Sequence, residues 1–442
     1  MGALVLSVLA MVQSGRIVPF PEVSQSPEWT AEGLPGEDVG GWWSDDRIVQ
    51  ISEGGLTAVA TDDGEELWTL EPDTRVCGMA EEPSDGVGVV LLDGEHVDPD
   101  PRRTEEDPER SCDDVLAVDL DEGSELWRSG PLLEDGDPEE RYLEELDVSV
   151  HESGVVVRVD GELQGFDLSG GSRSWSHEGF TVDGTPCPAT DLLGKDGTHT
   201  MVAADCGAGD QISVHTVDAG DGEETSSFAF DRGPVEIDRD LASTTLLNAD
   251  PVMVHLDLGH RRGPERDHDP DLTDDGFDDP HWEQVLVFDE SGGLTWSRAD
   301  TWGNVGDHIH DGPPLLFGED RVHMRAGTAC GGSVHTHDLS DGRELWETSW
   351  DGDDHAAVAV QDGQLLVIRG GGPSDDKCRF LTGPREWQFY VLDARTGEAE
   401  PLTRQMKDIE RPEADQVWWQ DGRVYFIEPT NWEEDPSTVV AL

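Results

Sequence analysis

The chain is 442 residues long, and its 98 acidic residues outnumber its 29 basic ones so far that the formal net charge is -69. Such a charge repels DNA, RNA and anionic lipid surfaces, which excludes nucleic acid as a partner. High net charge can also prevent folding. However, the chain has 15 tryptophans and its acidic residues interleave with apolar ones at strand spacing, so we interpret the charge as the solvated surface of a folded protein.

The chain begins with an apolar run, Ala3 to Val12, which is too short to span a bilayer. No basic segment precedes this run and no clear small-x-small cleavage site follows it, so it resembles a signal peptide only imperfectly. We interpret residues 1–14 as the remnant of a signal or anchor segment that starts upstream; a buried apolar first strand is the alternative. The preferred interpretation predicts an extracytoplasmic protein, either secreted or anchored to a membrane at the cell surface.

One pattern recurs through residues 15–442: an apolar strand, often an aspartate, a turn that ends in glycine, and a tryptophan four residues after that glycine. Two degenerate copies have Ser226 after Gly222 and Pro401 after Gly397. The turn glycines follow one another at intervals of 48 to 70 residues, a period near that of a four-stranded propeller blade. The tryptophans of the five complete copies are Trp68, Trp127, Trp175, Trp296 and Trp346.

Each part of the pattern has a physical reason. Glycine tolerates the positive φ of a tight turn between antiparallel strands, and the aspartate can accept hydrogen bonds from backbone N–H groups of that turn. The tryptophan begins the outer strand, where its ring can bury on the order of 200 Å² against the next blade. The pattern therefore predicts sheets that are held together by side chains.

A second apolar strand precedes each copy of the turn, and eight such strands predict eight blades. The outer strand has only seven copies before the chain ends, so the sequence predicts an all-β, eight-bladed propeller of four-stranded antiparallel blades whose last blade is closed by the N-terminal strand. We place this closing strand near Gly15–Glu22, because Gly15 and Pro19 match the spacing of Gly397 and Pro401. Closure would remove exposed strand edges. The eight second strands start at Asp46, Asp85, Ser153, Thr198, Asp250, Glu319, Asp362 and Asp421.

The six cysteines include no CxxC pair, which favours disulfides in an oxidising compartment over zinc or thioredoxin-type chemistry. The blade assignment places Cys77 with Cys112 in one blade and Cys187 with Cys206 in another, and leaves Cys330 and Cys378 in adjacent blades. We predict these three pairs from about fifteen possible connectivities. Buried free thiols are the alternative.

The aspartate, turn glycine and tryptophan at this spacing closely resemble the PQQ-like repeat, also called the tryptophan-docking blade, over about residues 16–442. The resemblance implies the propeller fold. The family includes quinone-dependent dehydrogenases and also cofactor-free propellers such as the outer-membrane-assembly lipoprotein. The dehydrogenases have a disulfide of adjacent cysteines beside the quinone, and this sequence has no Cys-Cys dipeptide, so the resemblance favours the non-catalytic branch.

The longest insertion, about residues 259–282, lies between the second and third strands of the fifth blade and is rich in aspartate. Alternating carboxylates are typical ligands of Ca²⁺. The match to an EF-hand is poor, because Leu272 stands where that loop requires glycine and Pro270 stiffens the run. A solvated acidic loop is the preferred interpretation, and calcium is the alternative. The candidate ligands are Asp267, Asp269, Asp271 and Asp275.

Histidines recur two residues apart in the sixth blade, at His308 and His310 and at His335 and His337, with His323 nearby in sequence. Residues two apart on a strand share a face, so either pair could chelate a transition metal if a third ligand converged on it. We interpret them as ordinary sheet histidines. The doubled tryptophans Trp42-Trp43 and Trp418-Trp419 could line a groove, but one of each pair should be core because neighbouring side chains point to opposite faces.

The sequence contains no GxSxG elbow, HExxH helix or phosphate-binding glycine loop, and we assign no catalytic residue and no cofactor apart from the calcium alternative. The predicted function is that of a monomeric, non-catalytic scaffold that binds a protein or cell-envelope partner through its faces and blade loops. The alternative is a PQQ- or metal-dependent oxidoreductase.

Overall fold

The structure is a computed structural model. It describes residues 27–44, 46–93, 112–132, 146–206, 211–231, 243–260, 281–300, 315–318, 320–328, 331–350, 355–361, 363–370, 387–403, 406, 416–420, 422–428 and 436–442. These residues form eight four-stranded antiparallel sheets and one two-stranded hairpin.

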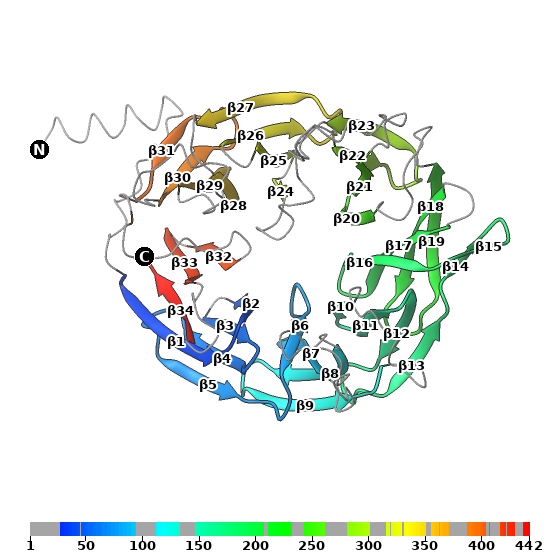
Figure 1. The fold of residues 1–442 in the computed structure, drawn as a ribbon, viewed down its shortest axis with the longest axis horizontal. Helices are drawn as coiled ribbons and strands as arrows, with labels where there is room; N and C mark the ends of the chain where they lie inside the picture. The colour runs from blue at the N-terminus through cyan, green and yellow to red at the C-terminus, as the bar shows by residue number, and fades with distance from the viewer. Residues whose placement is uncertain are drawn as a thin grey trace, which may run out of the picture. The chain divides into compact units, whose positions relative to one another are not determined.

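Five of the sheets belong to a compact unit of residues 31–306 and 430–437. Within this unit the first strand of each sheet lies on the inner side of an arc, and the fourth strands such as β5 and β9 lie on the outer side (Figure 1). The strands are β2 (Asp38–Ser44), β3 (Arg47–Ser52), β4 (Gly55–Ala60) and β5 (Glu66–Leu70); β6 (Val76–Met79), β7 (Val87–Asp93), β8 (Cys112–Asp119) and β9 (Ser124–Ser129); β10 (Asp147–His151), β11 (Gly154–Val159), β12 (Glu162–Phe166) and β13 (Arg173–His177); β16 (Ala189–Gly194), β17 (His199–Asp205), β18 (Gln211–Asp218) and β19 (Glu224–Asp231); and β20 (Ser243–Ala249), β21 (Val252–His260), β22 (His281–Phe288) and β23 (Leu294–Asp300).

The second compact unit comprises residues 1–30, 307–429 and 438–442. Its two complete sheets run in chain order, and the eighth sheet has the order β1-β34-β33-β32 and so combines both ends of the chain. The strands are β24 (Leu315–Phe317), β25 (Arg321–Thr328), β26 (Gly331–Asp338) and β27 (Glu344–Trp350); β28 (His355–Gln361), β29 (Gln364–Gly370), β30 (Trp387–Asp393) and β31 (Ala399–Pro401); and β32 (Val417–Gln420), β33 (Arg423–Glu428), β34 (Pro436–Ala441) and β1 (Trp29–Pro35).

The chain is thus the all-β, eight-bladed propeller that the repeat predicts, and all eight predicted second strands are present, as β3, β7, β11, β17, β21, β25, β29 and β33. These strands have sheet neighbours on both sides, and their faces are buried between layers, so they consist of nearly continuous apolar residues. In β11 all six residues are buried. In the outer strands exposed residues alternate with partly buried ones, as in β13.

The N-terminal strand completes the last blade, as predicted, but its position was wrong. The outermost place beside β34 is taken by β1, and the Glu28 N–H donates to the Ala441 carbonyl at 2.8 Å. The predicted segment, Gly15–Glu22, lies outside the described residues. The spacing of glycine and proline on which that prediction depended is a local similarity that does not decide which segment pairs with β34.

The turns of the repeat have the predicted geometry. All seven turn glycines have φ between 64° and 77°, in the left-handed region that favours glycine. The preceding aspartate accepts hydrogen bonds from the turn, as where Asp167 Oδ1 accepts from the N–H groups of Ser169, at 3.1 Å, and Gly170, at 2.9 Å. The Ser169 hydroxyl also donates to Asp167, and this bond holds the pKa of that carboxyl below its usual value.

Four tryptophans of the repeat, Trp68, Trp127, Trp175 and Trp346, contact the turn of the following sheet in the same way. The Trp127 ring covers Gly171 so closely that a Cβ on this glycine would lie 2.4 Å from the indole. The Trp127 Nε1–H donates to the carbonyl of Leu168 at 2.6 Å. The same two contacts join Trp68 to Gly123 and Leu120, Trp175 to Gly222 and Ala219, and Trp346 to Gly397 and Ala394.

The fourth sheet uses a different aromatic residue from the one that its degenerate repeat offers. Ser226 occupies the usual tryptophan position, but Phe228 covers Gly292, where a Cβ would lie 2.4 Å from the phenylalanine side chain. Residues 226 and 228 share a face of β19, because side chains on a strand alternate. A ring two residues further along can therefore reach the same glycine, although it has no N–H to donate.

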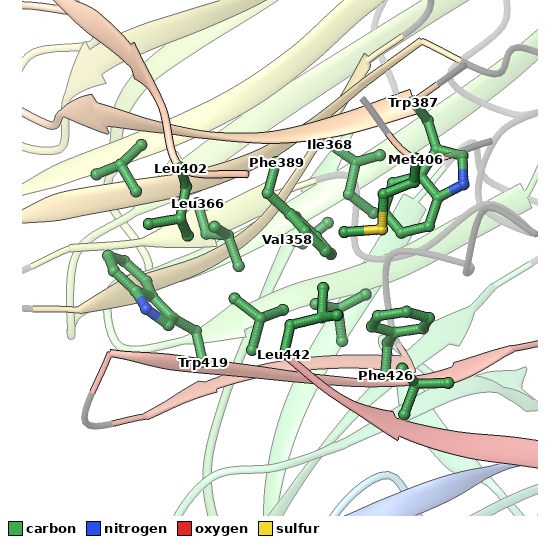
Figure 2. Packing of buried hydrophobic residues seen from close by; sticks show 14 residues of the cluster. Val358, Leu366, Ile368, Trp387, Phe389, Leu402, Met406, Trp419, Phe426 and Leu442 are labelled. Atoms are coloured by element: carbon green, nitrogen blue, oxygen red, sulfur yellow. The ribbon is translucent and has the colours of Figure 1, made fainter. Parts of the chain in front are cut away.

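The unit that contains residues 307–429 has its own apolar core between its seventh and eighth sheets (Figure 2). The ring of Trp387 meets Phe389 and Phe426 edge-on, with centroids 5.3 and 5.6 Å apart. Met406 and Leu442 complete the packing from outside the strands. Side chains of two sheets thus interlock in this core, as apolar residues of packed layers do.

We expect the turn glycine to matter for stability for two reasons, its positive φ and the close contact with the indole ring, and the second can be separated from the first by two substitutions. Gly171→Ala places a methyl group against Trp127, whereas Gly86→Ala has a similar φ of 74° and nothing within 4 Å. Gly86→Ala should cost about 1 kcal/mol and Gly171→Ala about 2–4 kcal/mol, measured as free energies of unfolding in urea. Equal costs for the two variants would show that the ring contributes nothing.

Candidate functional sites

A hairpin that the repeat does not require connects the third and fourth sheets. Its strands are β14 (Phe180–Val182) and β15 (Thr185–Cys187), and its two-residue turn has φ values of 51° at Asp183 and 84° at Gly184. In the view of Figure 1 this hairpin extends outward beyond the neighbouring sheets. An isolated two-stranded hairpin is marginally stable in water, so this one needs an anchor.

Two contacts anchor the hairpin to the fourth sheet. Cys187 of β15 forms a disulfide with Cys206, next to β17. The Phe180 ring stacks on His215 with centroids 3.7 Å apart and planes 12° apart. Burial lowers the pKa of His215, which keeps this imidazole neutral against the phenyl ring. The base of the hairpin is therefore fixed.

The disulfides agree with the predicted pairing as far as the structure describes it. Besides Cys187–Cys206, Cys77 of β6 is bonded to Cys112 of β8, and this second pair lies within one blade as predicted. The third predicted pair, Cys330 and Cys378, lies outside the described residues. Cys77 and Cys112 lie on strands of one sheet, whereas the Cys187–Cys206 pair, which was also predicted within one blade, joins the hairpin to the fourth sheet.

A group of buried and half-buried charged residues links the third, fourth and fifth sheets. Arg158 of β11 is almost fully buried and its Nε donates to Asp147 of β10 at 2.7 Å. Asp191 of β16 accepts the N–H of Leu246 on β20. Burial, and after it the charge of Asp147, raises the pKa of Asp191 to about 7. These contacts join inner strands, so we interpret the group as structural.

Ionisation of Asp191 should destabilise the fold as pH rises. Its pKa is higher in the folded chain than in the unfolded one, so its contribution is complete below about pH 4 and lost as pH rises through about 7. Asp191→Asn keeps an acceptor for Leu246 but cannot ionise. The stability of this variant relative to the unchanged protein should rise by about 2–4 kcal/mol between pH 4 and 8, measured by urea unfolding. Asp183→Asn, at the exposed hairpin turn, is the matched control and should show no such trend.

The histidine pair His335 and His337 of β26 has a third ligand candidate beside it. Glu344 of β27 lies directly opposite His337 in the sheet register. One ligand atom from each of these three side chains lies within 4.8 Å of the others, and His335 Nδ1 is 3.0 Å from Glu344 Oε2. The sequence analysis missed the glutamate because only the paired register of β26 and β27 reveals it.

Another histidine of the same sheet, His323, does not join this group. His323 of β25 lies opposite Thr336 in the sheet register, on the other face of the sheet from His335 and His337. Its Nδ1 is hydrogen-bonded to the Thr336 hydroxyl at 2.7 Å. Burial lowers the pKa of His323 to about 4. His323 therefore lies in the same blade as His335 and His337 but on its other face, while His308 and His310 lie outside the described residues. The calcium candidates Asp267, Asp269, Asp271 and Asp275 also lie outside them, between β21 and β22.

His335 lies within hydrogen-bonding distance of a serine on one side and of a glutamate on the other, which resembles the arrangement of a catalytic Ser–His–Glu triad. Ser333 Oγ is 2.6 Å from His335 Nε2, opposite the contact with Glu344. A serine nucleophile also requires N–H donors for the oxyanion. Ser333 lies on a central strand whose residues pair with both β25 and β27, so in this described sheet the backbone offers no oxyanion hole. The arrangement does not support acyl-transfer chemistry.

The doubled tryptophans are divided between core and surface as predicted. Trp42 is buried and its Nε1–H donates to the Ala80 carbonyl at 2.7 Å, and Trp419 is buried in the core of Figure 2. Trp43 and Trp418 are only partly buried. Both pairs therefore serve first as packing residues of inner strands.

These features define an eight-bladed propeller with four-stranded blades joined by aromatic–glycine contacts. No family model and no curated protein sequence matches the chain. Within the described residues, no helix is long and apolar enough to cross a membrane.

Solved structures show the same fold. BamB from Moraxella catarrhalis has a TM-score of 0.53 at 13% identity, covering 96% of this chain and 100% of its own. The computationally designed Ika8 protein has a TM-score of 0.53 at 15% identity, covering 94% and 99%. The quinohemoprotein alcohol dehydrogenase ADHIIG from Pseudomonas putida HK5 has a TM-score of 0.53 at 12% identity, covering 96% and 78%. The chain thus has the fold of the PQQ-like propellers, and at these identities the likeness extends to fold alone.

Proposed function

We propose that the chain is a non-catalytic, extracytoplasmic scaffold that binds a protein partner through the hairpin β14–β15. The observation that carries the proposal is that this hairpin is additional to the eight sheets and yet is fixed at its base by the Cys187–Cys206 disulfide and the Phe180–His215 stack. Rigid scaffolds that present connecting segments are suited to binding. A fixed hairpin loses little conformational entropy when a partner binds.

The hairpin offers its backbone and mostly uncharged side chains rather than charge. Its eight residues, 180–187, contain a single charged side chain, Asp183, in a chain where 29% of residues are charged. Its two strands form a separate sheet, so in the described structure its outer edges are not part of any blade. An extended segment of another protein can add to such an edge through main-chain hydrogen bonds. A protein strand is therefore the partner that this surface suits best.

The disulfides support the proposed compartment. Cys77–Cys112 and Cys187–Cys206 both link strands or strand ends of this fold, and disulfides of this kind persist in oxidising environments. The resemblance of the repeat to the cofactor-free branch of the PQQ-like propellers also supports a scaffold without catalysis.

Site-specific cross-linking tests the proposal. A photoreactive amino acid replaces Thr181, an exposed residue of β14, or Thr69, an exposed residue of the outer strand β5. We expect position 181 to form a cross-link to one discrete protein of the cell envelope and position 69 to form none. Shortening the hairpin from residues 181–186 to a two-glycine turn should abolish capture by a tagged chain while leaving the melting temperature within a few degrees.

Cross-linking at both positions alike, or capture that survives the shortened hairpin, would contradict the assignment of the hairpin as the binding element. Dye-linked dehydrogenase activity after addition of quinone and calcium would instead support the oxidoreductase alternative.

A further inference from the structure

We propose that His335, His337 and Glu344 form a binding site for a divalent first-row transition-metal ion of the zinc class. The site lies in the sixth sheet and is independent of the hairpin. Two imidazoles and one carboxylate are donors that Zn²⁺ and Co²⁺ accept, whereas Ca²⁺ and Mg²⁺ prefer oxygen ligands alone. Three protein ligands would leave a further coordination position for water or a small ligand.

The backbone sets the three donors close together. His335 and His337 are two residues apart on β26 and so share a face of the sheet, with ring centroids 6.3 Å apart and planes only 6° apart. A β-bulge between Thr336 and His337 brings His337 opposite Glu344. The distance of 3.0 Å between His335 Nδ1 and Glu344 Oε2 matches that between two ligands of one ion, about 3.0–3.4 Å for bonds near 2.1 Å. The Glu344 side chain is 42% exposed and can adjust to an ion.

Both imidazoles are oriented by neighbouring groups as metal ligands are. His337 Nδ1 lies 3.3 Å from the Gly342 carbonyl, which can only accept, so this nitrogen carries the proton and Nε2 carries the lone pair. The Ser333 hydroxyl lies 2.6 Å from His335 Nε2 and holds this ring with Nδ1 toward Glu344; because the carboxylate only accepts, Nδ1 carries a proton there, and a bound ion would displace that proton. Outer hydrogen bonds of this kind fix the tautomer and the ring orientation of ligating histidines.

Comparison with the other sheets shows that His337 is exceptional. His337 pairs with Glu344, which is the second residue after the turn glycine Gly342. In each of the other sheets that contain the repeat turn, the residue at the position of His337 is buried and apolar. Burying an imidazole there costs desolvation that valine avoids, so the repeat fold does not require this histidine. The equivalent residues are Val59, Val118, Phe166, Val217, Phe288 and Leu392.

The fourth sheet contains the same array without its third ligand. Ser213, His215 and Glu224 repeat the contacts of the sixth sheet, with 2.8 Å between Ser213 Oγ and His215 Nε2 and 3.2 Å between His215 Nδ1 and Glu224 Oε2. The bulge also recurs, between Thr216 and Val217. Val217 stands where the sixth sheet has His337. This array should therefore bind no metal, and it supplies an internal control.

Titration of the intact, disulfide-bonded chain with Co²⁺ tests the proposal, because four- or five-coordinate Co²⁺ with nitrogen ligands absorbs visible light far more strongly than the hydrated ion. A chain of net charge -69 attracts every cation, so the titration is made in millimolar Mg²⁺ and about 0.5 M NaCl, which screens carboxylate binding. We expect one Co²⁺ per chain with this spectrum, displaced by one Zn²⁺. His337→Val, which copies Val217, should weaken binding on the order of 100-fold or more, and Glu344→Gln should weaken it as well.

The converse substitution tests sufficiency. Val217→His in the fourth sheet should create a second Co²⁺ site with His215 and Glu224, raising the stoichiometry from one to two. Unchanged binding in His337→Val, or the absence of a nitrogen-ligated Co²⁺ spectrum in the unchanged protein, would overturn the proposal. If His337→Val does not fold, as judged by circular dichroism, then Glu344→Gln decides: this exposed carboxylate can be changed without disturbing the core, and undiminished affinity there would reject the site.

Discussion

The contact between an aromatic ring and the turn glycine of the next sheet is the interaction on which this propeller depends. In the part of the chain that the structure describes, the four-stranded sheets share no ladder with one another, so side chains must hold neighbouring blades together. Each docked indole does so in two ways, since its face covers a glycine that has no Cβ and its N–H satisfies a carbonyl of the same turn. Glycine is required at this position twice over, for the positive φ and for the close approach of the ring.

The sheets of a repeat protein can be compared with one another, because equivalent positions in different sheets have the same backbone conformation and the same neighbours. Where one sheet departs from the others without a packing reason, another constraint must explain the departure. The hairpin β14–β15 is one such departure, since no other described pair of sheets has a separate two-stranded insertion between them. His337 is another, since the six other sheets that contain the repeat turn place apolar side chains there. Trp68 and Trp127, by contrast, conform to the repeat and need no explanation beyond it.

The sequence predicted those parts of the structure that have local signals. Turn glycines, the aspartates before them and continuous apolar runs locate eight blades, and correct blades in turn predict the pairs Cys77–Cys112 and Cys187–Cys206. What failed depends on pairing at long range. The closing strand β1 has no turn of its own to mark it, and Phe228 replaces tryptophan from two residues further along the strand. Glu344 joins the histidines only through the register of β26 and β27.

Buried ionisable groups in this acidic chain act in opposite directions on its stability. Burial lowers the pKa of His151, His215 and His323, so their contribution is complete above about pH 6.5 and is lost as pH falls below it. Burial raises the pKa of Asp191, so its contribution is lost as pH rises toward 7. The two effects overlap between about pH 4 and 7 and partly cancel. Each kind of buried group therefore reduces the dependence of stability on pH that the other kind causes in this range.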